Sequence, residues 1–139
     1  MIATTVIVHV KPENVEDFKK INDELTQRLH KKTYLNAYTY YKIGRYKSAI
    51  VALKNALRTY PESDYREEIM YLIVDSSYRL AENSIASKQT DRYLAMMDSY
   101  LSFCEEFPES EHRKQVDRWA DNARDYLDRN ANNETTEEF

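Results

Sequence analysis

The sequence has one glycine, three prolines and one cysteine among its 139 residues. Phosphate-binding loops and nucleophile elbows need several glycines, so this composition argues against both kinds of enzyme site. The scarcity of glycine and proline also disfavours β-sheet folds, whose strands are joined by many tight turns. Because Cys104 is the only cysteine, no intrachain disulfide can form.

The sequence also lacks a run of about eighteen apolar residues, so we expect no membrane-spanning helix. Its net charge is −4, whereas a general nucleic-acid-binding protein carries a basic patch. Its three histidines, His9, His30 and His112, share no helical face, so we expect no metal site. No set of residues suits a cofactor or a catalytic mechanism, and we therefore predict a protein that is not an enzyme.

The clearest periodicity lies in residues 40–61. Apolar and small side chains recur there at three- and four-residue steps, at Tyr46, Ala49, Ile50, Leu53, Ala56, Leu57 and Tyr60. This spacing predicts a helix over residues 45–60. The only glycine, Gly44, separates it from a second periodic run over 33–43, and Pro61 ends it. The region is therefore predicted to form a helical hairpin.

This hairpin resembles a tetratricopeptide repeat, a 34-residue unit of two helices. The residues that carry the resemblance follow the order of the repeat pattern without a gap: Tyr40, Gly44, Tyr46, Ala49, Leu53, Ala56 and Pro61. One position departs from the pattern, because Thr33 stands where the repeat usually has tryptophan. The resemblance implies an all-α fold of stacked helical hairpins, an α-α superhelix.

The N-terminal residues differ in character from the rest of the chain. Residues 2–10 are β-branched and apolar, which predicts a short strand or extended arm at 1–12. A lone strand has no partner within this sequence, so a homodimer through the arm is one possibility. Residues 1–18 also resemble the start of antibiotic-biosynthesis monooxygenases, but the further strands of that domain are missing and we transfer no activity. A helix should follow at 13–31, with apolar residues at Val15, Phe18, Ile21, Leu25 and Leu29.

Two similar segments, at 60–66 and 107–113, indicate an internal repeat. Each has an aromatic residue, Pro, Glu and Ser in succession and ends in Arg. Ser63 and Ser110 are natural helix N-caps, so each segment should close one helix and open the next. We predict helices at 64–83, 90–107 and 111–129. The helical domain then covers 13–129, with a first repeat at about 30–63, a second at about 64–110, a capping helix at about 111–129 and a disordered acidic tail at 130–139.

The first helix of the hairpin suggests a binding surface. Tyr34, Tyr38 and Tyr41 share a side that in tetratricopeptide repeats lines the groove for partners. With the flanking lysines, the candidate partner-binding residues are Lys31, Tyr34, Tyr38, Tyr41 and Lys42. The alternative is that the three tyrosines pack beneath the apolar stripe of the 13–31 helix, because aromatic rings fill cores as readily as interfaces.

Residues 29–127, about 100 of the 139, are similar to the C-terminal part of the BamD family, lipoproteins of the outer-membrane β-barrel assembly machinery. The resemblance rests on the Tyr40-Tyr41 pair before Gly44, on the Tyr-Pro-Glu-Ser and Phe-Pro-Glu-Ser closures, and on the sequence from Ser77 to Ala81 that leads to Lys88, Arg92 and Tyr93. The export signal, the lipid-carrying cysteine and the additional repeats of the family do not occur in this sequence. We therefore expect the chain to correspond to a C-terminal portion.

The BamD resemblance implies a scaffold without chemistry of its own, on the periplasmic face of the outer membrane in the parent protein. The implied partners are the periplasmic domains of BamA, which is the barrel-forming subunit, and smaller accessory lipoproteins. A lipid anchor outside this sequence would give the only membrane association. The alternative is a generic repeat adaptor that binds a peptide or partner protein in the tyrosine-lined groove.

Overall fold

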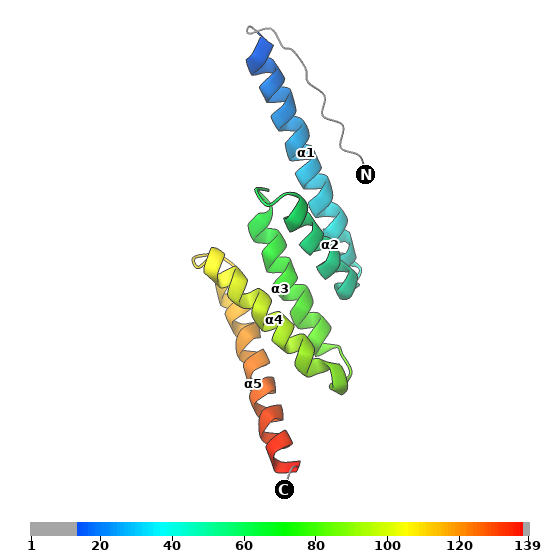
Figure 1. The fold of residues 1–139 in the computed structure, drawn as a ribbon, viewed down its shortest axis with the longest axis vertical. Helices are drawn as coiled ribbons and strands as arrows, with labels where there is room; N and C mark the ends of the chain where they lie inside the picture. Colours follow the sequence, from blue (N-terminus) through cyan, green and yellow to red (C-terminus); the bar gives the residue numbers. More distant parts are fainter. Residues whose placement is uncertain (1–13, 138–139) are drawn as a thin grey trace.

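The computed structural model describes residues 14–137, so the predicted strand or arm at 1–12 lies outside the described residues. Within them the chain forms five helices and no strand: α1 (Val15–Lys42), α2 (Tyr46–Thr59), α3 (Arg66–Glu82), α4 (Ala86–Glu106) and α5 (Arg113–Glu137). Successive helices run antiparallel and form a staggered stack, with α3 between α2 and α4 (Figure 1). The predicted all-α fold of stacked helical hairpins is confirmed.

Helix α3 is the centre of the stack because it contributes to both hydrophobic cores. The first core joins it to α1 and α2 and is formed by Ala37, Ala49, Leu53, Ala56, Ile69, Leu72 and Ile73. The second joins it to α4 and α5 and includes Val74, Tyr78, Ala81, Tyr93, Met96, Tyr100, Phe103, Val116, Ala120 and Ala123. Burial of these apolar side chains is the main stabilising contribution to the fold. Helix α3 therefore holds the α1–α2 hairpin and the α4–α5 hairpin in a fixed position relative to each other.

Gly44 makes the turn between α1 and α2, as its sequence position predicts. Its φ angle is +79°, in the left-handed region that side chains with a Cβ rarely adopt. The N–H of Arg45 donates to the carbonyl of Tyr40 at 2.9 Å, and the N–H of Gly44 donates to that of Tyr41 at 3.0 Å. These two bonds form a Schellman motif, which satisfies the last carbonyls of α1. No heavy atom lies within 4 Å of a Cβ built on Gly44, so backbone conformation and not crowding requires glycine here.

The two Pro-Glu-Ser segments form the same structure at the α2–α3 and α4–α5 connections. Ser63 Oγ accepts the N–H of Tyr65, and Ser110 Oγ accepts that of His112, both at 3.1 Å. Arg66 and Arg113 each donate from Nη1 to the carbonyl of the proline five residues before, again at 3.1 Å. Because each serine makes a turn before its helix, α3 and α5 begin three residues after the serine, slightly later than predicted.

Helix α1 is continuous over 28 residues and joins the two segments that we predicted as helices at 13–31 and 33–43. No glycine or proline lies between the two predicted segments, so nothing interrupts the backbone hydrogen bonds. This continuity corrects the packing partner that the alternative reading gave to the tyrosines. Phe18, Leu25 and Leu29 lie on the same helix as Tyr34, Tyr38 and Tyr41 and remain exposed, so they cannot form a layer above them. The three tyrosine rings are partly buried instead against the first core, which α1 forms with α2 and α3.

Two helix boundaries were predicted wrongly. Helix α4 begins at Ala86 and not at residue 90, because the Gln89 side chain donates to the carbonyls of Ala81 and Glu82 and closes a short connection. Helix α5 continues to Glu137, although we predicted its end near Arg129 and a disordered tail from residue 130. The described part of that tail, 130–137, contains no glycine or proline and extends the helix without needing a buried face.

Candidate protein-binding surfaces

The tyrosine face, which we define as Lys31, Tyr34, Tyr38, Tyr41 and Lys42, is a continuous surface on one side of α1. Its three rings contact each other in order, with centroids 5.9 Å apart for Tyr34 and Tyr38 and 5.7 Å apart for Tyr38 and Tyr41. The rings are half-buried, and both lysines are exposed. Sequence reasoning thus placed the five residues together correctly, although their role in binding stays a prediction.

Tyrosines from α2 and from the α2–α3 connection extend this row of rings. Tyr65 stacks on Tyr34 with a centroid distance of 4.8 Å and an interplanar angle of 11°. Tyr46, at the start of α2, meets the edge of Tyr41 at 6.0 Å. Such offset and edge contacts are the favourable arrangements for aromatic pairs. The row therefore fixes the orientation of the α1 tyrosines from both ends.

A buried carboxylate fastens the tyrosine face to α3. The Tyr41 hydroxyl donates to Asp75 Oδ2 at 2.7 Å, and Arg79 Nε donates to Asp75 Oδ1 at 2.5 Å. The Asp75 side chain is only 3% exposed, whereas that of Arg79 is 44% exposed. A buried charge needs paired donors, and Tyr41 and Arg79 supply them. Sequence reasoning missed Asp75, because an aspartate in the middle of a helix gives no local sign of a partner 34 residues earlier.

Two phenol groups of this face, those of Tyr34 and Tyr41, have a pKa raised above the ordinary value of a tyrosine. Burial, followed by the charge of Glu68, raises the pKa of Tyr34 to about 12. Burial and the hydrogen bond to Asp75 also raise the pKa of Tyr41. The Tyr41 hydroxyl therefore keeps its proton at neutral pH and remains a hydrogen-bond donor to Asp75.

Leu35 lies beside the tyrosine face, although the sequence analysis did not select it. Leu35 is 45% exposed. Lys31, Leu35, Tyr38 and Lys42 follow each other at steps of four, three and four, so they lie along one side of α1. An apolar and an aromatic side chain between two ammonium groups match the composition of protein interfaces. Leu35 follows Lys31 by four residues, and this helical spacing could have identified it from the sequence.

A second aromatic cluster joins α3 to α5. Tyr71 stacks on His112 with a centroid distance of 3.8 Å and lies 5.9 Å from Trp119. His112 Nε2 is 3.0 Å from Glu68 Oε2. His112 belongs to the second Pro-Glu-Ser segment, so this cluster connects the repeated turn to the neighbouring hairpin. These contacts pack the second repeated turn against α3.

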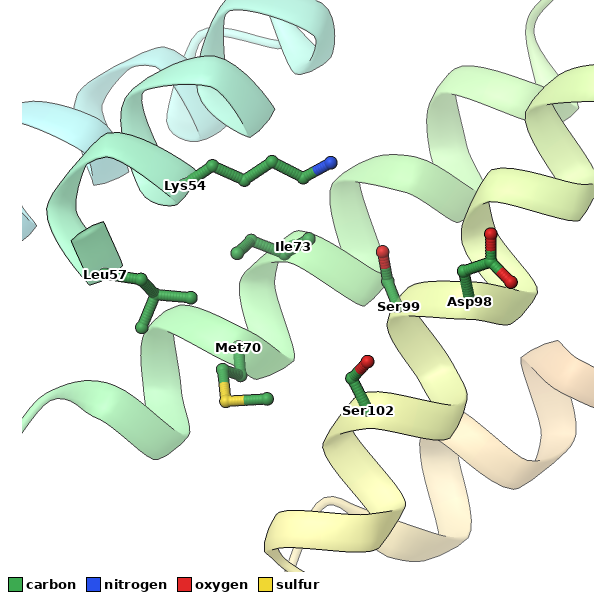
Figure 2. Close-up of a pocket in the computed structure, with 7 residues that line it drawn as sticks. All are labelled: Lys54, Leu57, Met70, Ile73, Asp98, Ser99 and Ser102. Atoms are coloured by element: carbon green, nitrogen blue, oxygen red, sulfur yellow. The ribbon is translucent and has the colours of Figure 1, made fainter. Parts of the chain in front are cut away.

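A shallow groove runs between α2 and α4, with α3 as its floor. Figure 2 shows Lys54 of α2 and Ser99 of α4 on its two sides and Ile73 of α3 between them. This part has a volume of about 270 Å³ and is lined by Lys54, Leu57, Met70, Ile73, Asp98, Ser99 and Ser102. Lys47, Val51 and Arg92 line its continuation toward the α1–α2 turn. The groove is a second exposed surface and a rival to the tyrosine face.

Within residues 14–137, no three side chains of the metal-ligating types come together. His30 is buried against Tyr60 with a centroid distance of 4.6 Å, while His112 lies in the α3–α5 cluster. His9 lies outside the described residues. Among the described helices, none has a stretch apolar and long enough to cross a membrane.

Comparison with known protein families gives a match over most of the chain. The sequence model of the family described as YfiO, outer membrane lipoprotein, matches residues 16–135, which includes nearly every described residue. No curated protein matches the chain.

Proposed function

The chain belongs to the YfiO family of outer membrane lipoproteins, the BamD-like family, and from this premise we propose that it is a non-enzymatic scaffold in the assembly of β-barrel outer membrane proteins. Its partners would be the periplasmic domains of BamA and accessory lipoproteins, on the periplasmic face of the outer membrane. The observation that carries the proposal is the family match over residues 16–135 together with the stacked hairpins that those residues form.

The tyrosine face is the surface that we assign to the partner. Aromatic rings held by neighbouring rings lose little side-chain entropy on binding, which favours them as interface anchors. The link through Asp75 supports this rigidity, because it ties Tyr41 to the central helix. Within residues 14–137, neither Lys31 nor Lys42 takes part in an ion pair, so both are available to acidic groups of a partner.

We expect Lys31→Glu combined with Lys42→Glu to weaken binding to the soluble periplasmic domains of BamA by about tenfold or more. A glutamate at each of the two positions would repel the acidic groups of the partner that the lysines attract. The measurement is isothermal titration calorimetry with the full chain. Both side chains are exposed, so the fold should be unaffected, and circular dichroism would check this.

The matched control reverses two lysines of the rival groove, Lys47→Glu with Lys54→Glu. It changes the net charge by the same amount but should leave the affinity within about twofold. An equal loss in both variants would point to overall charge and argue against the tyrosine face. If the unmodified chain binds no periplasmic domain of BamA, the assembly role itself is wrong.

A further inference from the structure

The α2–α4 groove has the length and the regular lining that a bound helix requires. Its floor and walls all come from α2, α3 and α4, in the middle of the chain. Lys47 and Leu57 mark its two ends on α2, ten residues or about 15 Å apart. The side chains of α3 that line the floor follow each other at steps of three and four, which is the spacing of one helix side. They are Met70, Ile73, Ser77 and Leu80.

The wall that α4 contributes is lined by small side chains. Ala95, Ser99 and Ser102 follow each other at steps of four and three, and Figure 2 shows the two serines on the α4 side of the groove. The Ser99 hydroxyl donates to the carbonyl of Ala95 at 3.3 Å, so it already has a partner. The distance between packed helices depends on the side chains between them, and small residues allow the closest approach. A rod-shaped partner can therefore reach Ile73 on the floor.

The groove suits a helix better than an extended peptide. Every residue that lines these two parts of the groove lies within α2, α3 or α4, so its backbone N–H and C=O groups are used inside those helices. An extended peptide would find few hydrogen-bond partners for its own backbone on such a surface. A helix satisfies its own backbone groups and needs only an apolar side to bury in the groove.

The borders of the groove are basic, which defines the charge of a partner. Lys47 and Lys54 of α2 are exposed, and Arg92 of α4 is half-buried. Among the residues that the structure describes, none of these three takes part in an ion pair. Arg92 Nη1 donates to Ser84 Oγ, which holds the guanidinium at the end of the groove near the α1–α2 turn. Asp98 is the acidic residue among those that line the two parts described above.

We propose that the α2–α4 groove binds an amphipathic helix of a partner protein, about three turns long, with acidic residues on both borders of its apolar side. The apolar side covers Ile73 and Leu80, and the carboxylates pair with Lys47, Lys54 and Arg92. Lys47 and Lys54 are about 10 Å apart along α2, so the positive charge is spread along the groove. This spread matches several carboxylates of a helix better than the single headgroup of a lipid. The contact goes beyond the scaffold role, because it does not use the tyrosine face.

The first test measures binding of a designed peptide to the full chain by fluorescence anisotropy. The probe is a labelled peptide of about 15 residues that a lactam bridge on its outer side holds helical. Leucines follow each other at steps of three and four, with glutamates on both borders. We expect a dissociation constant on the order of 10 μM, and binding at least about tenfold weaker when lysines replace the glutamates. Equal affinity for the two peptides, or no binding of either, would overturn the proposal.

Charge reversal on the chain shows where the peptide binds. Lys47→Glu combined with Lys54→Glu should weaken binding of the glutamate peptide about tenfold and strengthen binding of the lysine peptide. The matched control, Lys31→Glu with Lys42→Glu, changes the net charge equally on the tyrosine face and should leave both affinities within about twofold. An equal loss in both double variants would overturn the proposal. The two pairs have the opposite expected effects on BamA binding, so failure of the groove proposal and failure of the scaffold role can be told apart.

A steric variant tests the groove without changing its charge. Ala95 is exposed on α4, and Ala95→Trp should fill the groove and abolish binding of the glutamate peptide. The matched control is Leu94→Trp, because Leu94 is 50% exposed and lines neither part of the groove. It should leave the affinity within about twofold, and circular dichroism would check that both variants fold. Peptide binding that survives Ala95→Trp would place the peptide elsewhere and overturn the proposal.

The same two variants test an anionic lipid as the alternative occupant. The full chain is sedimented with vesicles of phosphatidylglycerol and phosphatidylcholine, and the bound fraction is measured. We expect Ala95→Trp and Leu94→Trp to leave this fraction unchanged, which supports a helix as the occupant. Loss of vesicle binding with Ala95→Trp alone would assign the groove to a lipid and overturn the proposal.

Discussion

Replacing Phe103 with alanine should lower the free energy of unfolding by about 3–5 kcal/mol. Phe103 is fully buried in the core that joins α3, α4 and α5. Its ring lies 6.4 Å from that of Tyr71 and 5.9 Å from that of Phe107, measured between centroids. Truncation removes these contacts and leaves a cavity that the surrounding helices fill only in part. Urea denaturation followed by circular dichroism measures the change.

The matched control is Leu101→Ala, two residues earlier on α4. Leu101 is 56% exposed, so its truncation should change the unfolding free energy by no more than about 0.5 kcal/mol. A Phe103→Ala loss as small as that of the control would contradict the packing of α4 between α3 and α5.

The second large effect should come from Asp75→Ala, which we expect to lower the unfolding free energy by about 2–3 kcal/mol. The change removes the acceptor of both the Tyr41 hydroxyl and the Arg79 guanidinium. The expected loss is smaller than that from breaking a fully buried ion pair. The Arg79 side chain is 44% exposed, so its guanidinium can be hydrated once Asp75 is removed. The same urea titration measures it.

Two milder variants separate the contributions to this network. Tyr41→Phe removes one hydrogen bond and should cost about 1 kcal/mol, while Asp75→Asn keeps an acceptor for Tyr41 and should fall between the two. The effects of Tyr41→Phe and Asp75→Ala should not add in the double variant, because both remove the same bond. Full additivity would mean that the α1–α3 link does not exist in solution.

Local sequence signals were enough to predict the hairpin and to place three tyrosines on one side of its first helix. Gly44 and Pro61 gave the turn and the end of α2, because each has a backbone property that few other residues share. The three- and four-residue spacing gave the side of α1 that carries Tyr34, Tyr38 and Tyr41. These features depend on neighbours in the sequence, which explains why no structure was needed to find them.

Features that depend on distant residues could not be predicted. The role of Asp75 appears only when α3 is placed against α1. The sequence placed five apolar residues on one side of α1, but it did not show that they are exposed: Val15, Phe18, Ile21, Leu25 and Leu29. An amphipathic pattern indicates an apolar side of a helix without saying whether the same chain covers it.

The most direct test of the proposed scaffold role is photocrosslinking to the soluble periplasmic domains of BamA. A photoreactive benzoylphenylalanine replaces Tyr38 of the tyrosine face in one variant of the full chain and Val51 of the α2–α4 groove in another. Val51 is 57% exposed and Tyr38 is half-buried, so a longer side chain at either position can reach a partner. We expect a crosslinked complex from position 38 and none from position 51. Crosslinking from position 51 alone, or from neither position, would contradict the assignment of the tyrosine face as the surface that binds the assembly machinery.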